Sequence, residues 1–205
     1  MYTTAEKAEI LEALGESLRD CTRCKLHTSR TNLVFGAGSV NAKLVFVGEG
    51  PGADEDKAGY PFVGSAGVIL TKMIRSIGLE RDEVYICNVV KCRPPGNRNP
   101  EHDEMTECRQ FLYAQLDMID PKVVCTLGAI STQLLTNTTA TITKMRGKIY
   151  RREQHVIVPT FHPAYLFRSY SKKKYVWEDM KLIERLLEED ERREDQKLME
   201  EESLF

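Results

Sequence analysis

The chain has 205 residues, of which 41% are hydrophobic and 29% are charged. This composition is typical of one folded domain and argues against wholesale disorder. Its 29 Lys and Arg residues against 31 Asp and Glu residues give a net charge of −2, which taken alone counts against nucleic-acid binding through a uniformly basic surface.

No segment of the sequence has the length of a membrane-spanning helix. The longest apolar runs, such as residues 43–48, are strand-sized, whereas a membrane helix needs about 20 apolar residues. The first residues have the pattern of a helix start and not that of a secretory signal. We therefore expect a cytoplasmic protein that makes no membrane contact and keeps its thiols reduced.

Helical and strand-like hydrophobic patterns alternate along the chain. Thr3 and Glu6 have the spacing of a capping box, which predicts that a first helix begins at about Thr4. Such alternation indicates a three-layer α/β/α domain with a central, mostly parallel four-stranded sheet. Helices are predicted over residues 4–19, 62–77, 102–119, 128–135 and 178–197, and strands over residues 43–48, 83–90, 122–127 and 155–160.

The sequence contains six cysteines, which in a reducing compartment suggest metal binding or catalysis before disulfides. Cys87 and Cys125 lie inside predicted strands, where buried inert thiols are expected. The other four could face a common point, because two form a Cys-x-x-Cys pair, one follows a strand and one lies early in a helix. This candidate ligand set is Cys21, Cys24, Cys92 and Cys108. On ligand type alone it fits zinc and an iron–sulfur cluster equally well.

Loops rich in Gly, Pro, His and Asn follow three of the predicted strands, at the sheet edge where open α/β folds bind ligands. The loop at residues 48–56 is not a phosphate-binding loop, because no Gly-Lys-Ser/Thr follows and its acidic run would repel phosphate. Its glycines let main-chain amides approach a ligand closely. Phe62 offers an aromatic ring near the same opening, with an ordinary core position as the alternative.

Two polar residues at strand ends are candidates for ligand recognition. Asn88 lies in an apolar strand, where an unsatisfied amide costs about 1–3 kcal/mol. Its side chain can read a lactam-like edge that carries C=O beside N–H, or it can simply hold a neighbouring loop. His162 follows the last strand and could donate a hydrogen bond to a developing anion, although a lone histidine is more often structural.

The segment after His162 has an unusual combination of apolar and basic residues. Tyr165, Leu166 and Phe167 would form an exposed apolar wedge of the kind that enters a base stack. Arg168 and the lysines at residues 172–174 favour this interpretation over ordinary packing.

Four motifs in this order resemble family 4 uracil-DNA glycosylases, the iron–sulfur enzymes of bacteria and archaea. They are GEGPG at residues 48–52, PFVG at residues 61–64, NVVKCRPPGNR at residues 88–98 and HPAYLFR at residues 162–168. With the cysteines, the match spans about residues 21–168. The resemblance implies an α/β/α glycosylase fold, a [4Fe–4S] cluster rather than zinc, and hydrolytic removal of flipped-out uracil from single- or double-stranded DNA.

The resemblance also implies roles for individual residues. Phe62 would stack on the flipped uracil, and Asn88 would bind its polar edge and exclude cytosine. His162 would donate to the uracil O2 as negative charge collects there. The main chain at Gly48, Gly50 and Gly52 would surround the base, and Tyr165, Leu166 and Arg168 would contact DNA.

A carboxylate is needed to stabilise the cationic sugar or to orient water. Other glycosylase families place an aspartate two residues after the first glycine, where this chain has Gly50. Glu49 and Glu55 remain, and we expect Glu49 to be the more important catalytic residue and Glu55 to position water. A related branch binds DNA covalently through a Lys-Arg-Arg-Ile-His insertion that residues 95–100 lack, so we expect multiple turnover.

Two other functional classes fit part of the evidence. The first is a non-catalytic nucleic-acid-binding module stapled by zinc, and the second is an electron-transfer protein that uses a cluster. A binding module has no need of Asn88 buried beside Phe62 and His162, so the loop chemistry favours the enzyme.

The charge is unevenly divided along the chain. Residues 178–205 contain 12 acidic and 5 basic residues, a net of −7, which leaves +5 for residues 1–177. Residues 141–175 contain nine basic residues and one acidic residue. We therefore expect a glycosylase domain at residues 1–177 with a DNA-facing basic surface, followed by an acidic helix and tail at residues 178–205.

The tail has an incomplete resemblance to a sliding-clamp-binding peptide. Gln196 and Met199 have the required spacing, but Glu202 and Ser203 replace the expected aromatic pair. We therefore favour a frayed acidic helix end as the interpretation of this tail. For the whole protein we expect a monomer.

Overall fold

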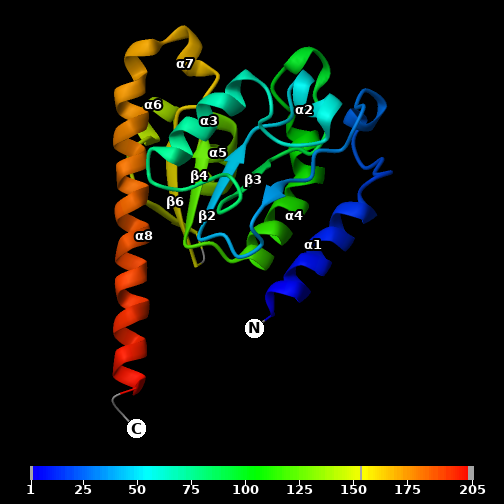
Figure 1. The fold of residues 1–205 in the computed structure, drawn as a ribbon. Helices are drawn as coiled ribbons and strands as arrows, with labels where there is room; N and C mark the ends of the chain where they lie inside the picture. The colour runs from blue at the N-terminus through cyan, green and yellow to red at the C-terminus, as the bar shows by residue number, and fades with distance from the viewer. Residues whose placement is uncertain (1, 153, 203–205) are drawn as a thin grey trace.

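The computed structural model describes residues 2–152 and 154–202, and for residues 193–195 and 197–202 it describes the main chain alone. Within these residues a six-stranded sheet forms the centre of the molecule, with strand order β1-β3-β2-β4-β6-β5 (Figure 1). Its four inner strands are parallel to one another, which confirms the predicted parallel arrangement of the central strands. They are β2 (Leu44–Gly48), β3 (Tyr85–Asn88), β4 (Val123–Leu127) and β6 (His155–Thr160).

The sheet has two edge strands that the sequence did not predict. Strands β1 (Ala37–Gly38) and β5 (Tyr150–Arg152) pair antiparallel with β3 and β6. The predicted number of four strands is therefore too small. Strands of two and three residues are too short to display a hydrophobic alternation, so only their pairing reveals them.

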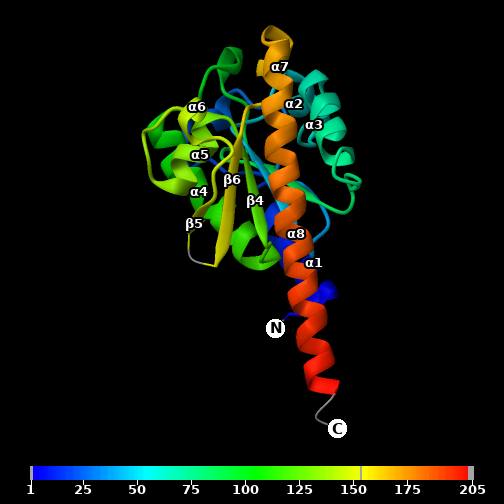
Figure 2. The same cartoon turned by 90° about the vertical axis from the view of Figure 1, so that its left-hand side faces the viewer.

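Helices cover both faces of the sheet, as expected for an α/β/α domain (Figure 2). Within β2, Val45 and Val47 point to one face and Leu44 and Phe46 point to the other, and all four are buried. The first face is covered by α1 (Thr4–Ser17), α4 (His102–Ile119) and α5 (Ala129–Thr136), and the second by α3 (Ser65–Arg75) and α8 (Lys173–Glu202). Shorter elements are α2 (Ala53–Ala58), α6 (Ile142–Met145), α7 (Tyr165–Arg168) and single 3-10 turns at Lys25–Thr28, Pro95–Asn97 and Tyr170–Lys172.

Helix α1 begins where its capping box predicts. The Thr3 hydroxyl oxygen accepts from the Glu6 main-chain N–H at 3.3 Å, and the Glu6 carboxylate accepts from the Thr3 N–H at 2.7 Å. The helix ends at Ser17, two residues before the predicted end at residue 19.

Helix α3 begins three residues later than predicted, at Ser65, with Gly64 as its N-cap. The cause is Phe62, whose φ of 52° places it in the left-handed region and so outside any right-handed helix. Helix α2 was not predicted, because its six residues lie in an acidic loop without hydrophobic periodicity.

Helix α8 joins the basic and acidic parts of the chain without a break. It begins at Lys173 rather than at the predicted residue 178, so residue 177 lies inside it. Val176, Met180 and Ile183 on its first half are buried against the sheet. The second half projects beyond the body of the molecule (Figures 1 and 2).

Ionic contacts fix α8 to the body at two levels. Asp179 is fully buried and accepts hydrogen bonds from Arg146 Nε at 3.0 Å and from the Thr160 hydroxyl at 2.7 Å. Farther along, Asp190 lies 3.6 Å from the Lys122 ammonium. Lysines at the amino ends of the strands thus offset part of the helix's negative charge, on the side of the sheet away from the loops that follow β2, β3 and β6.

No helix in the described part of the chain is long and apolar enough to cross a membrane. The Met199 side chain and residues 203–205 lie outside the description, so the clamp-peptide hypothesis stays a prediction.

Candidate functional site

A cavity of about 500 Å³ lies at the carboxyl ends of β2, β3 and β6. It is at this edge that the sequence places the ligand site, because the ends of parallel strands meet there. The cavity, called the pocket below, is lined by residues from separate loops that the sequence had singled out: Glu49, Gly50, Gly52, Glu55, Phe62, Asn88, His162 and Arg168. Three of the residues predicted to contact uracil or DNA do not line it: Gly48, Tyr165 and Leu166.

Asn88 forms one wall of the pocket. It is the last residue of β3 and is 1% exposed. Among the described residues, its side-chain Oδ1 is buried without a hydrogen-bond partner. A buried acceptor left in this state costs about 1–3 kcal/mol, which a ligand carrying an N–H group would recover.

Gly48 makes room for this arrangement. It lies beside Asn88 in the parallel pairing of β2 and β3. A Cβ at Gly48 would overlap Asn88 Oδ1 and come within 2.8 Å of the Phe62 ring. Any larger residue would therefore fill the space between the amide and the ring.

Phe62 is held in a backbone conformation that bulky residues rarely adopt. Its φ is 52°, its side chain is buried, and its ring centroid lies 5.7 Å from that of His162. Gly67 of α3 packs so closely on the Phe62 carbonyl that a Cβ there would overlap it. Strained residues of this kind concentrate at functional sites, and here the strain turns an aromatic ring toward the pocket.

His162 is prepared to donate a hydrogen bond while remaining neutral. Its Nδ1 accepts from the Ala164 main-chain N–H at 3.2 Å, which leaves the ring proton on Nε2. Burial lowers the pKa of His162 to about 4, and the nearby Glu55 opposes this shift. At neutral pH the imidazole therefore offers one N–H donor and no charge.

The two candidate carboxylates of the pocket have different surroundings. Burial raises the pKa of Glu49. Glu55 instead braces two loops, because its Oε1 accepts from the main-chain N–H groups of Val63 at 3.0 Å and Gly64 at 2.9 Å, while its Oε2 accepts from that of Gly52 at 3.1 Å. This carboxylate therefore ties the loop after β2, at Gly52, to the residues that directly follow Phe62.

The four candidate ligand cysteines converge on a second hollow, called the thiol site below. Its sulfur-bearing residues are Cys21, Cys24, Cys92 and Cys108. Burial raises the pKa of Cys24 and Cys92 and raises that of Cys108 to about 11. Among the side chains that the structure describes, no three of His, Cys, Asp or Glu are placed to hold a single metal ion.

Donors surround the sulfur atoms of the thiol site. The Lys91 main-chain N–H lies 3.3 Å from Cys108 Sγ, Arg30 Nη1 lies 3.3 Å from Cys92 Sγ, and Arg23 Nη1 lies 3.7 Å from Cys21 Sγ. The other two cysteines, Cys87 and Cys125, are fully buried free thiols within strands, which confirms the prediction made for them.

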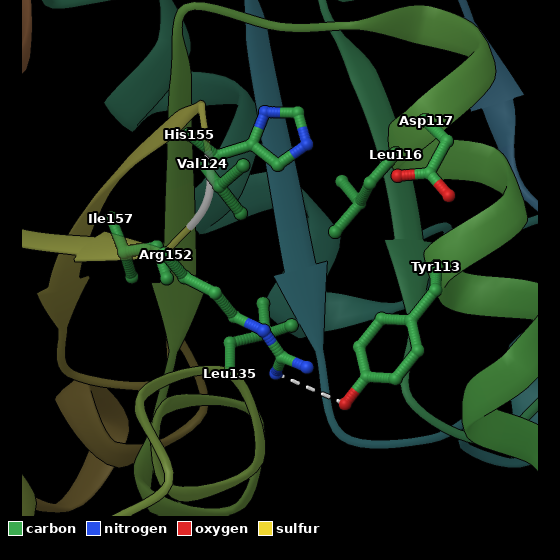
Figure 3. A pocket seen from close by; sticks show the side chains of 8 residues that line it. All are labelled: Tyr113, Leu116, Asp117, Val124, Leu135, Arg152, His155 and Ile157. Atoms are coloured by element: carbon green, nitrogen blue, oxygen red, sulfur yellow. Dashed lines mark hydrogen bonds between the residues drawn. The ribbon is translucent and has the colours of Figure 1, made fainter.

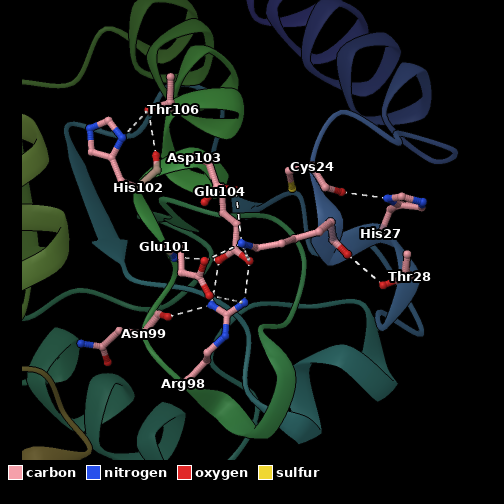
Figure 4. Close-up of polar contacts among 11 residues, drawn as sticks. Cys24, His27, Thr28, Arg98, Asn99, Glu101, His102, Asp103, Glu104 and Thr106 are labelled. Atoms are coloured by element: carbon pink, nitrogen blue, oxygen red, sulfur yellow. Dashed lines mark hydrogen bonds and ion pairs between the residues drawn. The ribbon is translucent and has the colours of Figure 1, made fainter.

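An ionic network joins the thiol site to the pocket (Figure 4). Lys25, the residue after Cys24, contacts Glu101 and lies 3.2 Å from Asp103. The buried Glu104 accepts a bidentate pair from Arg98 at 2.8 and 2.6 Å, and these bonds lower the pKa of Glu104. Arg98 also lines the pocket, so one group of charges orders both sites.

One residue of the expected apolar wedge, Leu166 in α7, points into the core. Tyr165 and Phe167 are 41% and 57% exposed, whereas Leu166 is 4% exposed and packs with the core of the second face. The prediction of three exposed apolar residues is therefore wrong for Leu166. Successive side chains of a helix are rotated by about 100°, so three consecutive residues cannot all face the solvent when one side of the helix packs on the core. Basic and aromatic residues continue on the surface, with Lys173 Nζ 3.9 Å from the Tyr170 ring centroid.

Several contributors to the two sites were not singled out from the sequence. Asn97 and Arg98 line the pocket, and Arg30 contacts the thiol site. Residues 97 and 98 lay inside a recognised motif, which was a usable signal. Arg30 carried none, because its contact with Cys92 spans 62 positions in the sequence.

A smaller cavity of about 180 Å³ lies elsewhere, between α4, α5 and the sheet (Figure 3). His155, which lines it, is the first residue of β6. The cavity therefore lies toward the opposite end of the strands from the pocket. Its Arg152 guanidinium is already engaged with the Tyr113 hydroxyl at 3.1 Å. We take the pocket lined by the loops after β2, β3 and β6 as the candidate active site.

Comparisons with known proteins agree with the geometry. Residues 35–181 match the sequence family described as the uracil DNA glycosylase superfamily. The type-4 uracil-DNA glycosylase of Thermotoga maritima is 46% identical over 184 residues, which cover 88% of this chain and 94% of that protein. The type-4 enzyme of Sulfurisphaera tokodaii is 47% identical over 185 residues, covering 86% and 84%. A type-5 uracil-DNA glycosylase of Pyrobaculum aerophilum is 30% identical over 146 residues, covering 62% and 63%.

Proposed function

The chain belongs to the uracil-DNA glycosylase superfamily, and we propose from this premise how its pocket recognises uracil and cleaves it from DNA. The protein excises uracil from DNA in repair. The observation that carries the assignment to this pocket is the buried, unpartnered Oδ1 of Asn88 beside the Phe62 ring. A flipped base would stack on Phe62 while its edge meets the amide.

The chemistry of the amide accounts for discrimination between uracil and cytosine. Uracil carries an N3–H donor beside carbonyl acceptors, so Asn88 Oδ1 accepts from N3–H while Nδ2 donates to a carbonyl. Cytosine has an acceptor at N3 beside an amino donor. With cytosine in the same position, the N3 acceptor would face the Asn88 Oδ1 acceptor and the amino donor would face the Nδ2 donor. Buried polar atoms would then stay unpaired, which strongly disfavours binding in a desolvated site.

The reaction breaks the bond between the sugar C1′ and the base N1. The bonding electrons leave with the base, so negative charge collects on uracil while the sugar becomes oxocarbenium-like. Water then adds to C1′, and the proton that it loses passes in net terms to the uracil anion, which leaves as neutral uracil beside an abasic site. His162 Nε2–H would donate to O2 of the developing anion. The hydrogen bond from the Ala164 N–H to Nδ1 fixes the direction of this donor in advance, and the imidazole is neutral.

The two carboxylates divide the remaining tasks. We assign Glu49 to the cationic side of the reaction, where a carboxylate stabilises the sugar and orients water. Glu55 was expected to position water. Its three main-chain hydrogen bonds favour a positioning role exerted on the loops themselves.

DNA would approach across the surface that carries α7. Arg168 lines the pocket, and Tyr165 is exposed beside it. Leu166 would have to leave the core to enter a base stack, whereas Phe167 already faces outward. We therefore assign DNA contact to Tyr165, Phe167 and Arg168, with Leu166 contributing only after such a movement.

The thiol site fits a [4Fe–4S] cluster in its donor set. Four cysteines line one hollow, and Lys91, Arg30 and Arg23 direct N–H groups at their sulfur atoms. Cationic residues and N–H donors would offset the negative charge of four iron-binding thiolates and of the cluster's inorganic sulfide. When bound, the cluster would anchor the loops that carry Cys24 and Cys92, next to the wall of the pocket.

Release of free uracil from a uracil-containing oligonucleotide tests the proposed function. The protein should release uracil, but neither cytosine nor thymine, from single- or double-stranded substrate. Asn88→Ala should lower kcat/KM by about 5- to 150-fold, the equivalent of about 1–3 kcal/mol for one buried hydrogen-bonding group. Asn41→Ala, at an exposed and remote asparagine, should match the parent. Absence of uracil release from both strand forms would contradict the assignment.

The pH dependence of kcat/KM separates the roles of Glu49 and His162. Glu49 must be ionised to act, and its pKa is raised, so activity should fall on acidification at a pH above the ordinary glutamate range. His162 becomes protonated only at about pH 4. In Glu49→Gln the residual activity should therefore persist to lower pH than in the parent. If Glu49→Gln instead has the parent's kcat/KM, and its activity falls on acidification at the same pH as the parent's, Glu49 has no catalytic role. Glu12→Gln on the exposed face of α1 is the control.

Metal analysis tests the cluster. The purified protein should be brown and contain about four iron atoms per chain, as four thiolates require for this cluster type. Cys24→Ala should lose colour and iron, while Cys87→Ala and Cys125→Ala should keep both, since these two thiols lie inside strands away from the thiol site. A colourless protein containing zinc would contradict the proposal.

A further inference from the structure

Lys91 carries a charge in the interior of the protein. Its side chain is 1% exposed, and a buried ammonium is costly unless several acceptors surround it. Its Nζ donates to the Asn88 main-chain carbonyl oxygen at 2.9 Å and to Gln115 Oε1. The acceptors are neutral oxygens, so the ammonium is held by dipoles rather than by an opposite charge.

The cage around this ammonium is preformed. Gln115 Nε2 donates to the Phe35 carbonyl at 3.0 Å and to the Tyr85 hydroxyl at 3.0 Å, which fixes Oε1 toward Lys91. The Phe35 ring centroid lies 5.8 Å from the ammonium, within the range of a cation–π contact. Such a complete set of partners indicates a built position rather than a side chain trapped by packing.

Lys91 also touches the thiol site. Its main-chain N–H donates to Cys108 Sγ at 3.3 Å, and the next residue is Cys92. Its side chain meanwhile holds the carbonyl of Asn88, whose amide faces the pocket. One residue thus makes hydrogen bonds to the thiol site and to the residue that reads the base.

We propose that Lys91 is a positioning residue that fixes the end of β3, and with it the Asn88 amide, relative to the thiol site. The inference rests on the proposed function, since it assumes that Asn88 binds uracil. Without the ammonium, the Asn88 main-chain carbonyl and Gln115 Oε1 lose their donor. The position of the Asn88 side-chain amide in the pocket is then no longer fixed. The expected consequence is weaker binding of the base in a protein whose cluster is intact.

The test compares Lys91→Met with Lys7→Met. Methionine preserves the length of the side chain and removes the ammonium. Lys7 is the matched control, because its ammonium donates to another main-chain carbonyl, that of Ile119, at 3.1 Å and far from the pocket. Uracil release, inhibition by free uracil, and iron content per chain are measured on each protein.

Lys91→Met should retain the parent's iron content and visible absorbance. Its kcat/KM should fall at least tenfold, and its inhibition constant for free uracil should rise at least tenfold. Lys7→Met should match the parent in all three measurements. If Lys91→Met does not fold, Lys91→Met/Gln115→Met, which removes the ammonium together with its side-chain acceptor, is measured in the same way with the same expectation.

Three results would overturn the inference. Inhibition by free uracil at the parent's level would show that Lys91 does not position Asn88. A loss of activity fully accounted for by lost iron would assign Lys91 to cluster retention alone. A parent protein that releases no uracil would overturn the proposed function and this inference with it.

Discussion

The rest of the pocket depends on one hydrogen-bond acceptor that is buried without a partner among the described residues. Asn88 Oδ1 lies at the end of an interior strand, and the neighbouring residues preserve an open space in front of it. Gly48 contributes no side chain there, and Phe62 accepts a left-handed backbone to bring its ring alongside. A pocket arranged around one unsatisfied amide favours a ligand that supplies the missing donor. The proposed recognition of uracil by Asn88 therefore links the energetics of folding to specificity.

The parallel sheet converts distant sequence segments into one site. The loops after β2, β3 and β6 end at the same edge, so Glu49, Asn88 and His162 line one cavity although more than 100 residues separate the first from the last. The thiol site shares with the pocket the loop after β3, which carries Cys92. Lys25 and Arg98 connect the two regions through ionic contacts with the buried Glu104, and Lys91 connects them through its own hydrogen bonds in the interior.

Much of this arrangement could be predicted from the sequence, because it follows from local patterns. Apolar runs predict the four parallel strands, the Thr3–Glu6 pair predicts the start of α1, and the cysteine spacing predicts the convergence of four thiols. What could not be predicted depends on tertiary contacts. The edge strands exist only through pairing, the late start of α3 follows from the strained φ of Phe62, and the burial of Leu166 depends on how α7 meets the core.

A crystal structure of the protein with free uracil bound would show whether this pocket recognises uracil through the Asn88 amide. We expect the ring stacked on Phe62, with N3–H within hydrogen-bonding distance of Asn88 Oδ1 and O2 facing His162 Nε2. Uracil bound at another site, or bound in the pocket with its polar edge turned away from Asn88, would contradict this recognition.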